Sequence, residues 1–274
     1  LTVGFGSGGT SWSMTRHGIL ATAVEIEREV IRSAHLFETQ NFGVVDHPLL
    51  TVVINDARDH INTTPTRYDV ISSDVTNINY RQNNNLYTVE FFELMAKNLA
   101  EGGIACSWIP GEMPAPAMKI LLRSFQEVFP HTSVWYMNHS DTSFLILIGT
   151  ENALQLDFAR IEQAYAIPEV QKDLRSIDVT HPYQIASCLV ADEQTVRQWT
   201  EGSPLHTDDH PNLEYAVMDW STPPSVNLGN TLIALSKGLP PIDWFLDERV
   251  DQQILRTQIR RGHGYLRARL AATR

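Results

Sequence analysis

Four short stretches hold residues whose types and spacing could do chemistry, and the first of them, Gly4–Thr10, is rich in glycine. Glycines let the backbone turn sharply and approach a ligand where a Cβ atom would clash. A helix that starts directly afterwards would offer free N–H groups and the positive end of its dipole to that ligand. The spacing of Gly4, Gly6 and Gly9 also fits a nicotinamide-dinucleotide site, or a tight turn without a ligand. This stretch alone therefore leaves the ligand open.

Two carboxylates come next, each at the end of an apolar run. Glu25 closes the run Ala21–Val24, about 20 residues after the glycines, where an acid can accept hydrogen bonds from both hydroxyls of a ribose. It could instead be a charge near the start of a helix. Asp56 follows the run Leu50–Ile54 and precedes Ala57. It could accept a hydrogen bond from an adenine amino group, or cap the next helix.

The fourth stretch is Tyr68–Asn77, in which an apolar run ends at Asp74. In parallel sheets ligands bind at the carboxyl ends of the strands. An acid at that position could take a proton from a nucleophile or hold a cationic amine. The alternative is a helix cap or a loop carboxylate, and Asp69, which begins the run, is expected to be structural.

These residues need a scaffold that gathers strand ends, and apolar runs alternate with helical patterns over the first 150 residues, as in βαβ units. The predicted strands are Leu1–Gly4, Ala21–Glu25, Leu50–Ile54, Tyr68–Ser73 and Ile104–Ile109. The predicted helices are Ser11–His17, Glu29–Phe37, Ala57–Asn62, Val89–Leu99 and Ala115–Val128.

Two further runs, Thr132–Met137 and Ser143–Gly149, are separated by a turn-rich connector and predict an antiparallel hairpin. A mostly parallel sheet that closes with such a hairpin is the arrangement of class I S-adenosylmethionine-dependent methyltransferases. We therefore predict an α/β, Rossmann-like fold with a seven-stranded sheet, followed by C-terminal helices. An ordinary dinucleotide-binding fold would continue with a parallel strand.

Three regions are expected along the chain: a nucleoside-binding, Rossmann-like catalytic domain (1–150), a helical and loop extension packed on it (151–222), and a helical tail (223–274). The helices predicted within the last two regions are Leu156–Ala164, Glu169–Ile177, Pro182–Leu189, Asp192–Thr200 and Glu248–Ala272.

Composition narrows the function classes. The 274 residues carry a net charge of −11, which argues against a nucleic-acid partner and is compatible with a cationic substrate. Cys106 and Cys188 lie far apart and show neither metal-ligand nor disulfide spacing. We expect no metal and a reducing, cytoplasmic location. No run is long enough to span a bilayer. The chain begins inside a strand, so we expect further sequence upstream.

Taken together, the four stretches resemble the spermidine synthase family of aminopropyltransferases over roughly residues 1–150. Asn85–Phe92 and Leu99–Ile104 also match motifs of that family. The later stretch Leu205–Tyr215 resembles a motif of a bacterial subgroup in which such a domain is joined to a multi-spanning membrane region. That resemblance implies that, in a full-length protein with such a membrane region, this domain would lie at the cytoplasmic face of the membrane.

Family members transfer the aminopropyl group of decarboxylated S-adenosylmethionine to putrescine and release methylthioadenosine. The resemblance implies that Glu25 binds the ribose and Asp56 the adenine. The remaining nucleoside contacts would come from Gly4, Gly6, Gly8 and Ala57.

On the acceptor side, the resemblance implies that Asp74 receives the proton of the attacking amine and that Ser7, Asn77 and Tyr87 line the substrate site. The family usually has an acid where this chain has Ser7, and another where it has Asn77. Losing two carboxylates weakens the field that favours a doubly charged polyamine. The family's N-terminal β-hairpin region is also absent from the sequence.

Two other functions stay open on the same scaffold. One is a methyltransferase that uses S-adenosylmethionine itself, and the other is a non-catalytic domain that senses a nucleoside or polyamine. A nicotinamide oxidoreductase is disfavoured by the hairpin and by Asp56. The expected partners are a small nucleoside and an amine acceptor, and a homodimer stays open.

Overall fold

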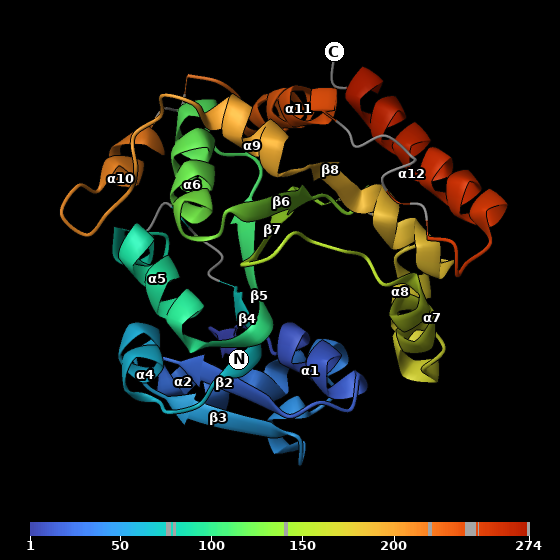
Figure 1. Cartoon of the computed structure of the whole chain (residues 1–274). Coiled ribbons are helices and arrows are strands. Elements are labelled where there is room, and N and C mark those ends of the chain that lie inside the picture. The colour runs from blue at the N-terminus through green and yellow to red at the C-terminus, as the bar shows by residue number, and fades with distance from the viewer. Residues whose placement is uncertain are drawn as a thin grey trace.

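A computed structural model of the chain describes residues 1–74, 78, 81–139, 142–218, 221–238, 245 and 247–272. The described residues form one mixed sheet with helices on both faces (Figure 1). Its strands are β1 (Thr2–Val3), β2 (Ala21–Glu25), β3 (Leu50–Ile54), β4 (Tyr68–Ser73), β5 (Leu99–Pro110), β6 (His131–Trp135), β7 (Phe144–Thr150) and β8 (Leu189–Ala191).

The strand order is β3-β2-β1-β4-β5-β7-β6-β8. The first five strands of this order are parallel to one another, and β7 then runs antiparallel to β5 and β6 antiparallel to β7. The hairpin therefore turns back so that its second strand, β7, lies next to the parallel half. The predicted antiparallel hairpin and the methyltransferase-like arrangement are both confirmed.

The sheet of the described residues has eight strands, where seven were predicted. The extra strand, β8, pairs antiparallel with β6. The segment predicted as the helix Pro182–Leu189 is instead a 3₁₀ helix, η4 (Pro182–Cys188), and its last predicted residue begins β8. Three apolar residues are too few to show a period, so the position of β8 depends on its pairing with β6 rather than on local pattern.

The α-helices of the described residues are α1 (Gly9–Arg16), α2 (Arg28–Arg32), α3 (Glu38–Asn41), α4 (Ala57–Thr63), α5 (Val89–Asn98), α6 (Ala115–Val128), α7 (Phe158–Tyr165), α8 (Pro168–Ser176), α9 (Glu193–Thr200), α10 (Asn212–Ala216), α11 (Pro224–Leu235) and α12 (Gln252–Ala272). Further 3₁₀ helices are η1 (Ala34–Phe37), η2 (Val44–Asp46), η3 (Arg81–Leu86) and η5 (Ser236–Gly238). The predicted helix Glu29–Phe37 is thus divided into α2 and η1.

Helices α4, α5 and α6 lie side by side on one face of the sheet, and α1 lies on the other (Figure 1). A large buried cluster on the first face includes Phe91, Phe92 and Phe125. A second cluster joins β6 and η4 to α12. At Gly262 of α12 a Cβ atom would lie 1.8 Å from the side-chain oxygen of Ser187, so only glycine allows this helix to approach η4 so closely.

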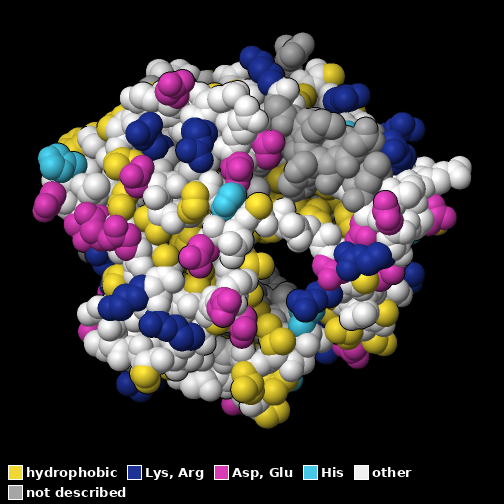
Figure 2. All heavy atoms as spheres, viewed as in Figure 1, with side chains coloured by type: hydrophobic (Ala, Val, Ile, Leu, Met, Phe, Trp, Pro, Cys, Tyr) yellow, Lys and Arg dark blue, Asp and Glu magenta, His cyan; other side chains and the backbone are white. Residues whose placement is uncertain are grey.

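Acidic side chains are scattered among basic ones over the face seen in Figure 2, and the surface is hollowed between the positions that α1 and α8 occupy in Figure 1. Within the described ranges, no helix combines the length and the apolar character that crossing a membrane requires.

Candidate functional site

The glycine-rich loop leaves β1 and ends at the start of α1. Gly4, Gly6 and Gly8 all have positive φ, at 87°, 55° and 90°. At Gly8, which caps α1, a Cβ atom would also lie 2.7 Å from the ring of Phe5. Glycine is therefore required at Gly8 both by backbone conformation and by the close approach of Phe5.

A buried asparagine holds the loop from the side. Asn41, at the end of α3, donates from its amide nitrogen to the backbone oxygen of Ser7 at 2.7 Å and to that of Ala34 at 2.9 Å. The Ser7 side chain itself is half-buried. No local sequence pattern predicts this role of Asn41, because its contact with Ser7 joins residues 34 positions apart.

Glu25 ends β2 and is 8% exposed. Its two carboxylate oxygens accept hydrogen bonds from the backbone N–H groups of Phe5 and Glu27, each at 3.0 Å. A carboxylate has about four lone-pair sites, so capacity is left for ribose hydroxyls. The next residue, Ile26, is 70% exposed and offers an apolar surface directly beside this acid. Ile26 was not among the predicted site residues.

Asp56 follows β3 and caps α4. Its Oδ1 accepts from the backbone N–H groups of Arg58 at 2.8 Å and Asp59 at 3.1 Å. Oδ1 of Asp56 therefore caps the helix, as one of the two alternatives predicted, whereas Oδ2 takes no part in those two bonds. Ala57 begins α4 and is buried.

Asp74 follows β4, and its backbone N–H donates to Val3 at 3.1 Å. The Ser72 hydroxyl donates to Oδ1 of Asp74 at 2.7 Å, and the side chain of Thr10, at the start of α1, also hydrogen-bonds to it. Burial raises the pKa of Asp74 above its ordinary value, against the opposite effect of these hydrogen bonds. The result is a partly desolvated carboxylate beside a helix N-terminus.

Tyr87 is fully buried in the large cluster. Burial is the main cause that raises the pKa of its phenol, and the charge of Asp74 adds to it, so the two side chains lie near one another. Asn77 falls outside the described residues.

Strand register brings the predicted nucleoside site to one edge of the sheet. Val3 pairs with Val24 of β2 and with Ser73 of β4, and Glu25 pairs with Ile54 of β3. The order along the edge is thus Asp56, Glu25, the glycine-rich loop and Asp74. Three gaps of about 4.8 Å give a length of roughly 15 Å. This length suits an adenine nucleoside with a short chain.

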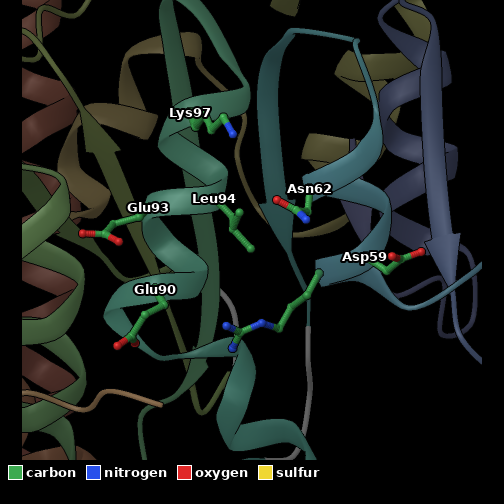
Figure 3. Close-up of a pocket in the computed structure, with 7 residues that line it drawn as sticks. Asp59, Asn62, Glu90, Glu93, Leu94 and Lys97 are labelled. Atoms are coloured by element: carbon green, nitrogen blue, oxygen red, sulfur yellow. The ribbon is translucent and has the colours of Figure 1, made fainter. Parts of the chain in front are cut away.

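A cleft of about 530 Å³ lies elsewhere, between α4 and α5 (Figure 3). It is lined by Arg58, Asp59, Asn62, Glu90, Glu93, Leu94 and Lys97. None of the predicted site residues lines it, and its walls are helix surfaces rather than strand ends. Arg58 is bound there to both carboxylate oxygens of Asp208, at 2.9 and 2.5 Å. Neither the position nor the mixed charge of this cleft fits the predicted chemistry.

Among the described residues, no group of three or more His, Cys, Asp or Glu side chains is placed to hold a metal ion. The chemistry of this edge is that of backbone N–H groups, carboxylates and hydroxyls.

Comparison with known proteins gives consistent results. Residues 1–138 match the family described as "Spermine/spermidine synthase domain". The chain is 28% identical over 138 residues to a polyamine aminopropyltransferase of Korarchaeum cryptofilum, covering 49% of this chain and 42% of that protein. It is 29% identical over 140 residues to a spermidine synthase of Dictyostelium discoideum, covering 50% and 49%.

A solved spermidine synthase in complex with the transition-state analogue AdoDATO superposes with a TM-score of 0.51 at 22% identity, covering 59% of this chain and 58% of that one. This likeness shows the fold. The chain spans about half the length of the curated relatives it matches. Because the family match covers half of its length, the chain belongs to the spermine/spermidine synthase family.

Proposed function

We propose that this chain binds decarboxylated S-adenosylmethionine along the carboxyl edge of the sheet and transfers its aminopropyl group to an amine. The observation that carries the proposal is Asp74, a partly desolvated carboxylate at the end of β4, on the same edge as the glycine-rich loop and Glu25.

The nucleoside would lie across β1, β2 and β3. The ribose hydroxyls would donate to the free lone pairs of Glu25, and the adenine amino group to Oδ2 of Asp56. Ile26 would pack against the base, since its side chain is exposed directly after Glu25. Gly4, Gly6 and Gly8 would let the backbone approach the ligand closely, with Ala57 flanking the base.

The reaction is a displacement at the carbon next to the sulfonium. The amine lone pair forms the new C–N bond, the C–S bond breaks, and its electron pair neutralises the sulfur to give methylthioadenosine. The proton of the attacking nitrogen goes to Asp74. Because the sulfonium is already a good leaving group, the protein mainly positions the reactants and accepts this proton.

A raised pKa suits Asp74 to this step, because a carboxylate whose pKa lies closer to neutrality is a stronger base. Ser7 and Tyr87 would lie on the acceptor side. Ser7 contributes no negative charge there, so the acceptor should be held with fewer ionic contacts than a site with three carboxylates would give.

The test compares Asp74→Asn with Asp69→Asn, which makes the same change at an exposed position of β4, the strand that Asp74 follows. Methylthioadenosine release from the decarboxylated nucleoside and putrescine is measured, together with methylthioadenosine affinity by calorimetry. Asp74→Asn should lower the rate by about 10²–10⁴ with little change in affinity. Asp69→Asn should behave as wild type.

Equal activity of Asp74→Asn and wild type would refute the role of Asp74. A wild-type protein that binds methylthioadenosine but transfers nothing to any amine would instead favour a non-catalytic sensor.

A further inference from the structure

Two side chains, one on β4 and one on its neighbour β5, mark which face of the sheet Asp74 occupies. Ser72 donates to Asp74, and the strand register places Ser72 opposite Cys106. Ser72 and Cys106 share a hydrogen bond, and burial raises the pKa of the Cys106 thiol to about 12, with the charge of Asp74 adding to that effect. Ser72, Cys106 and Asp74 therefore lie on one face.

Trp108 continues this row. Side chains two positions apart on a strand point to the same face, so Trp108 shares the face of Cys106 and lies nearer the carboxyl end. Ser73 pairs with Ser107, which puts Trp108 level with Asp74 on the adjacent strand, about 4.8 Å away between backbones.

The indole of Trp108 is stacked on Phe144 of β7, with ring centroids 3.6 Å apart and planes 25° from parallel. Phe144 pairs with Pro110, two residues after Trp108, so it also lies on this face. Both rings are half-buried, and neither is packed into the three buried hydrophobic clusters of the described residues. The stack is therefore placed beside the carboxylate and still reaches the surface.

An aromatic face beside a carboxylate suits an alkylammonium ion. The ring quadrupole attracts the cation, while the flat indole packs against its methylene chain. For a diamine, one nitrogen could reach Asp74 while the other, still charged, lies over the aromatic face.

We propose that the stacked pair of Trp108 and Phe144 forms one wall of the acceptor site and selects alkylammonium acceptors. The inference rests on the proposed function, because it names the acceptor side of the same site.

The test uses Trp108→Leu, which keeps an apolar side chain but removes the aromatic face, and Trp108→Phe, which keeps a smaller one. The control is Trp199→Leu, a half-buried tryptophan of α9 that already lies under the cation of Lys119. Putrescine binding is measured by calorimetry on the whole chain with methylthioadenosine present at saturation. Methylthioadenosine affinity and melting temperature are measured in parallel.

Trp108→Leu should weaken putrescine binding roughly tenfold, within the range expected of a cation–π contact. Trp108→Phe should fall between Leu and wild type. Trp199→Leu should bind putrescine as wild type does, and methylthioadenosine affinity should be the same in all four proteins.

A lower melting temperature of Trp108→Leu with unchanged putrescine affinity would overturn the proposal and leave the stack as packing. Failure of wild type to bind putrescine would overturn it as well. If wild type binds putrescine without turnover and Trp108→Leu weakens that binding, the aromatic site stands while the proposed transfer reaction fails.

Discussion

At the scale of single residues, each acid that we propose to contact the ligand at this edge also makes hydrogen bonds that hold the fold. Glu25 holds Phe5 and Glu27, Asp56 caps α4, and Asp74 is held by Ser72 and Thr10. Such bonds fix the direction of a carboxylate before a ligand arrives, which lowers the cost of ordering it on binding. They also mean that a simple loss of affinity in a variant does not identify a ligand contact.

The ribose role of Glu25 can be separated from its structural role with a modified ligand. In wild type, 2′-deoxy-methylthioadenosine should bind about 1–3 kcal/mol more weakly than methylthioadenosine, because one hydrogen bond to a charged acceptor is lost. In Glu25→Ala both ligands should bind with the same, weaker affinity. Calorimetry on the four combinations gives the coupling. A 2′-hydroxyl contribution that survives in Glu25→Ala would assign the ribose to another group.

At the scale of elements, the turn between β1 and α1 depends on Gly8. Gly8→Ala must bear a side chain at φ 90° with its Cβ 2.7 Å from the Phe5 ring and 3.0 Å from Asn41. We expect a loss of at least about 1–3 kcal/mol in unfolding free energy, together with weaker methylthioadenosine binding, because the loop must shift. Urea denaturation and calorimetry measure both.

The neighbouring Gly9→Ala is the matched control. A Cβ atom there would approach only the Ser7 hydroxyl, at 3.9 Å, and Gly9 is the first residue of α1. Alanine is the better helix former, so this variant should be as stable as wild type or slightly more stable. Equal effects of the two substitutions would show that the turn tolerates a side chain at Gly8.

Elements with strong local patterns could be predicted from the sequence, and those fixed by distant contacts could not. β2, β3 and β4 were predicted with their observed bounds, because a short run rich in apolar residues that ends at a polar residue is a local signal. β8 is too short for such a signal. The stack of Trp108 on Phe144 and the bond from Asn41 to Ser7 were also missed, since each depends on which segments the fold brings together. The sequence alone does not distinguish a helix cap from an adenine contact at Asp56, because both roles need an acid at the same position.

At the scale of the whole molecule, the stretch Leu205–Tyr215 contacts η3 and the start of α5, and so connects the C-terminal half of the chain to the elements that follow β4. His206 is 1% exposed. Its Nε2 donates to the backbone oxygen of Asn84 in η3 at 2.9 Å, and its Nδ1 accepts from the backbone N–H of Leu213 at 3.4 Å. Its backbone oxygen accepts from Val89 at the start of α5. Because one ring nitrogen must donate and the other accept, the bonding pattern requires neutral imidazole.

Buried histidines that are neutral in the folded state make the stability of the fold depend on pH. Burial is the main cause that lowers the pKa of His206, and the same cause lowers the pKa of four further histidines, His60, His139, His181 and His263. The unfolded chain then binds protons more readily than the folded one below the ordinary histidine pKa of about 6.5. The stability that these neutral side chains provide is present above that pH and is lost as pH falls below it.

We therefore expect the melting temperature to fall between pH 8 and pH 5.5, a window that lies above the ordinary range of Asp and Glu. Asp74 acts in the opposite direction, because its raised pKa lets the folded state keep a proton, but it is one group against five histidines.

His206→Gln should lower the unfolding free energy at pH 8 by about 1–3 kcal/mol, since the N–H of Leu213 loses its acceptor. On acidification this variant should then lose less stability than wild type. His210→Gln changes an exposed histidine of the same stretch and should follow the wild-type curve. The melting temperatures of the three proteins are measured at several pH values. A wild-type melting temperature that stays constant or rises towards pH 5.5 would show that the buried imidazoles do not control acid stability. A His206→Gln melting temperature that changes with pH in parallel with wild type would show the same.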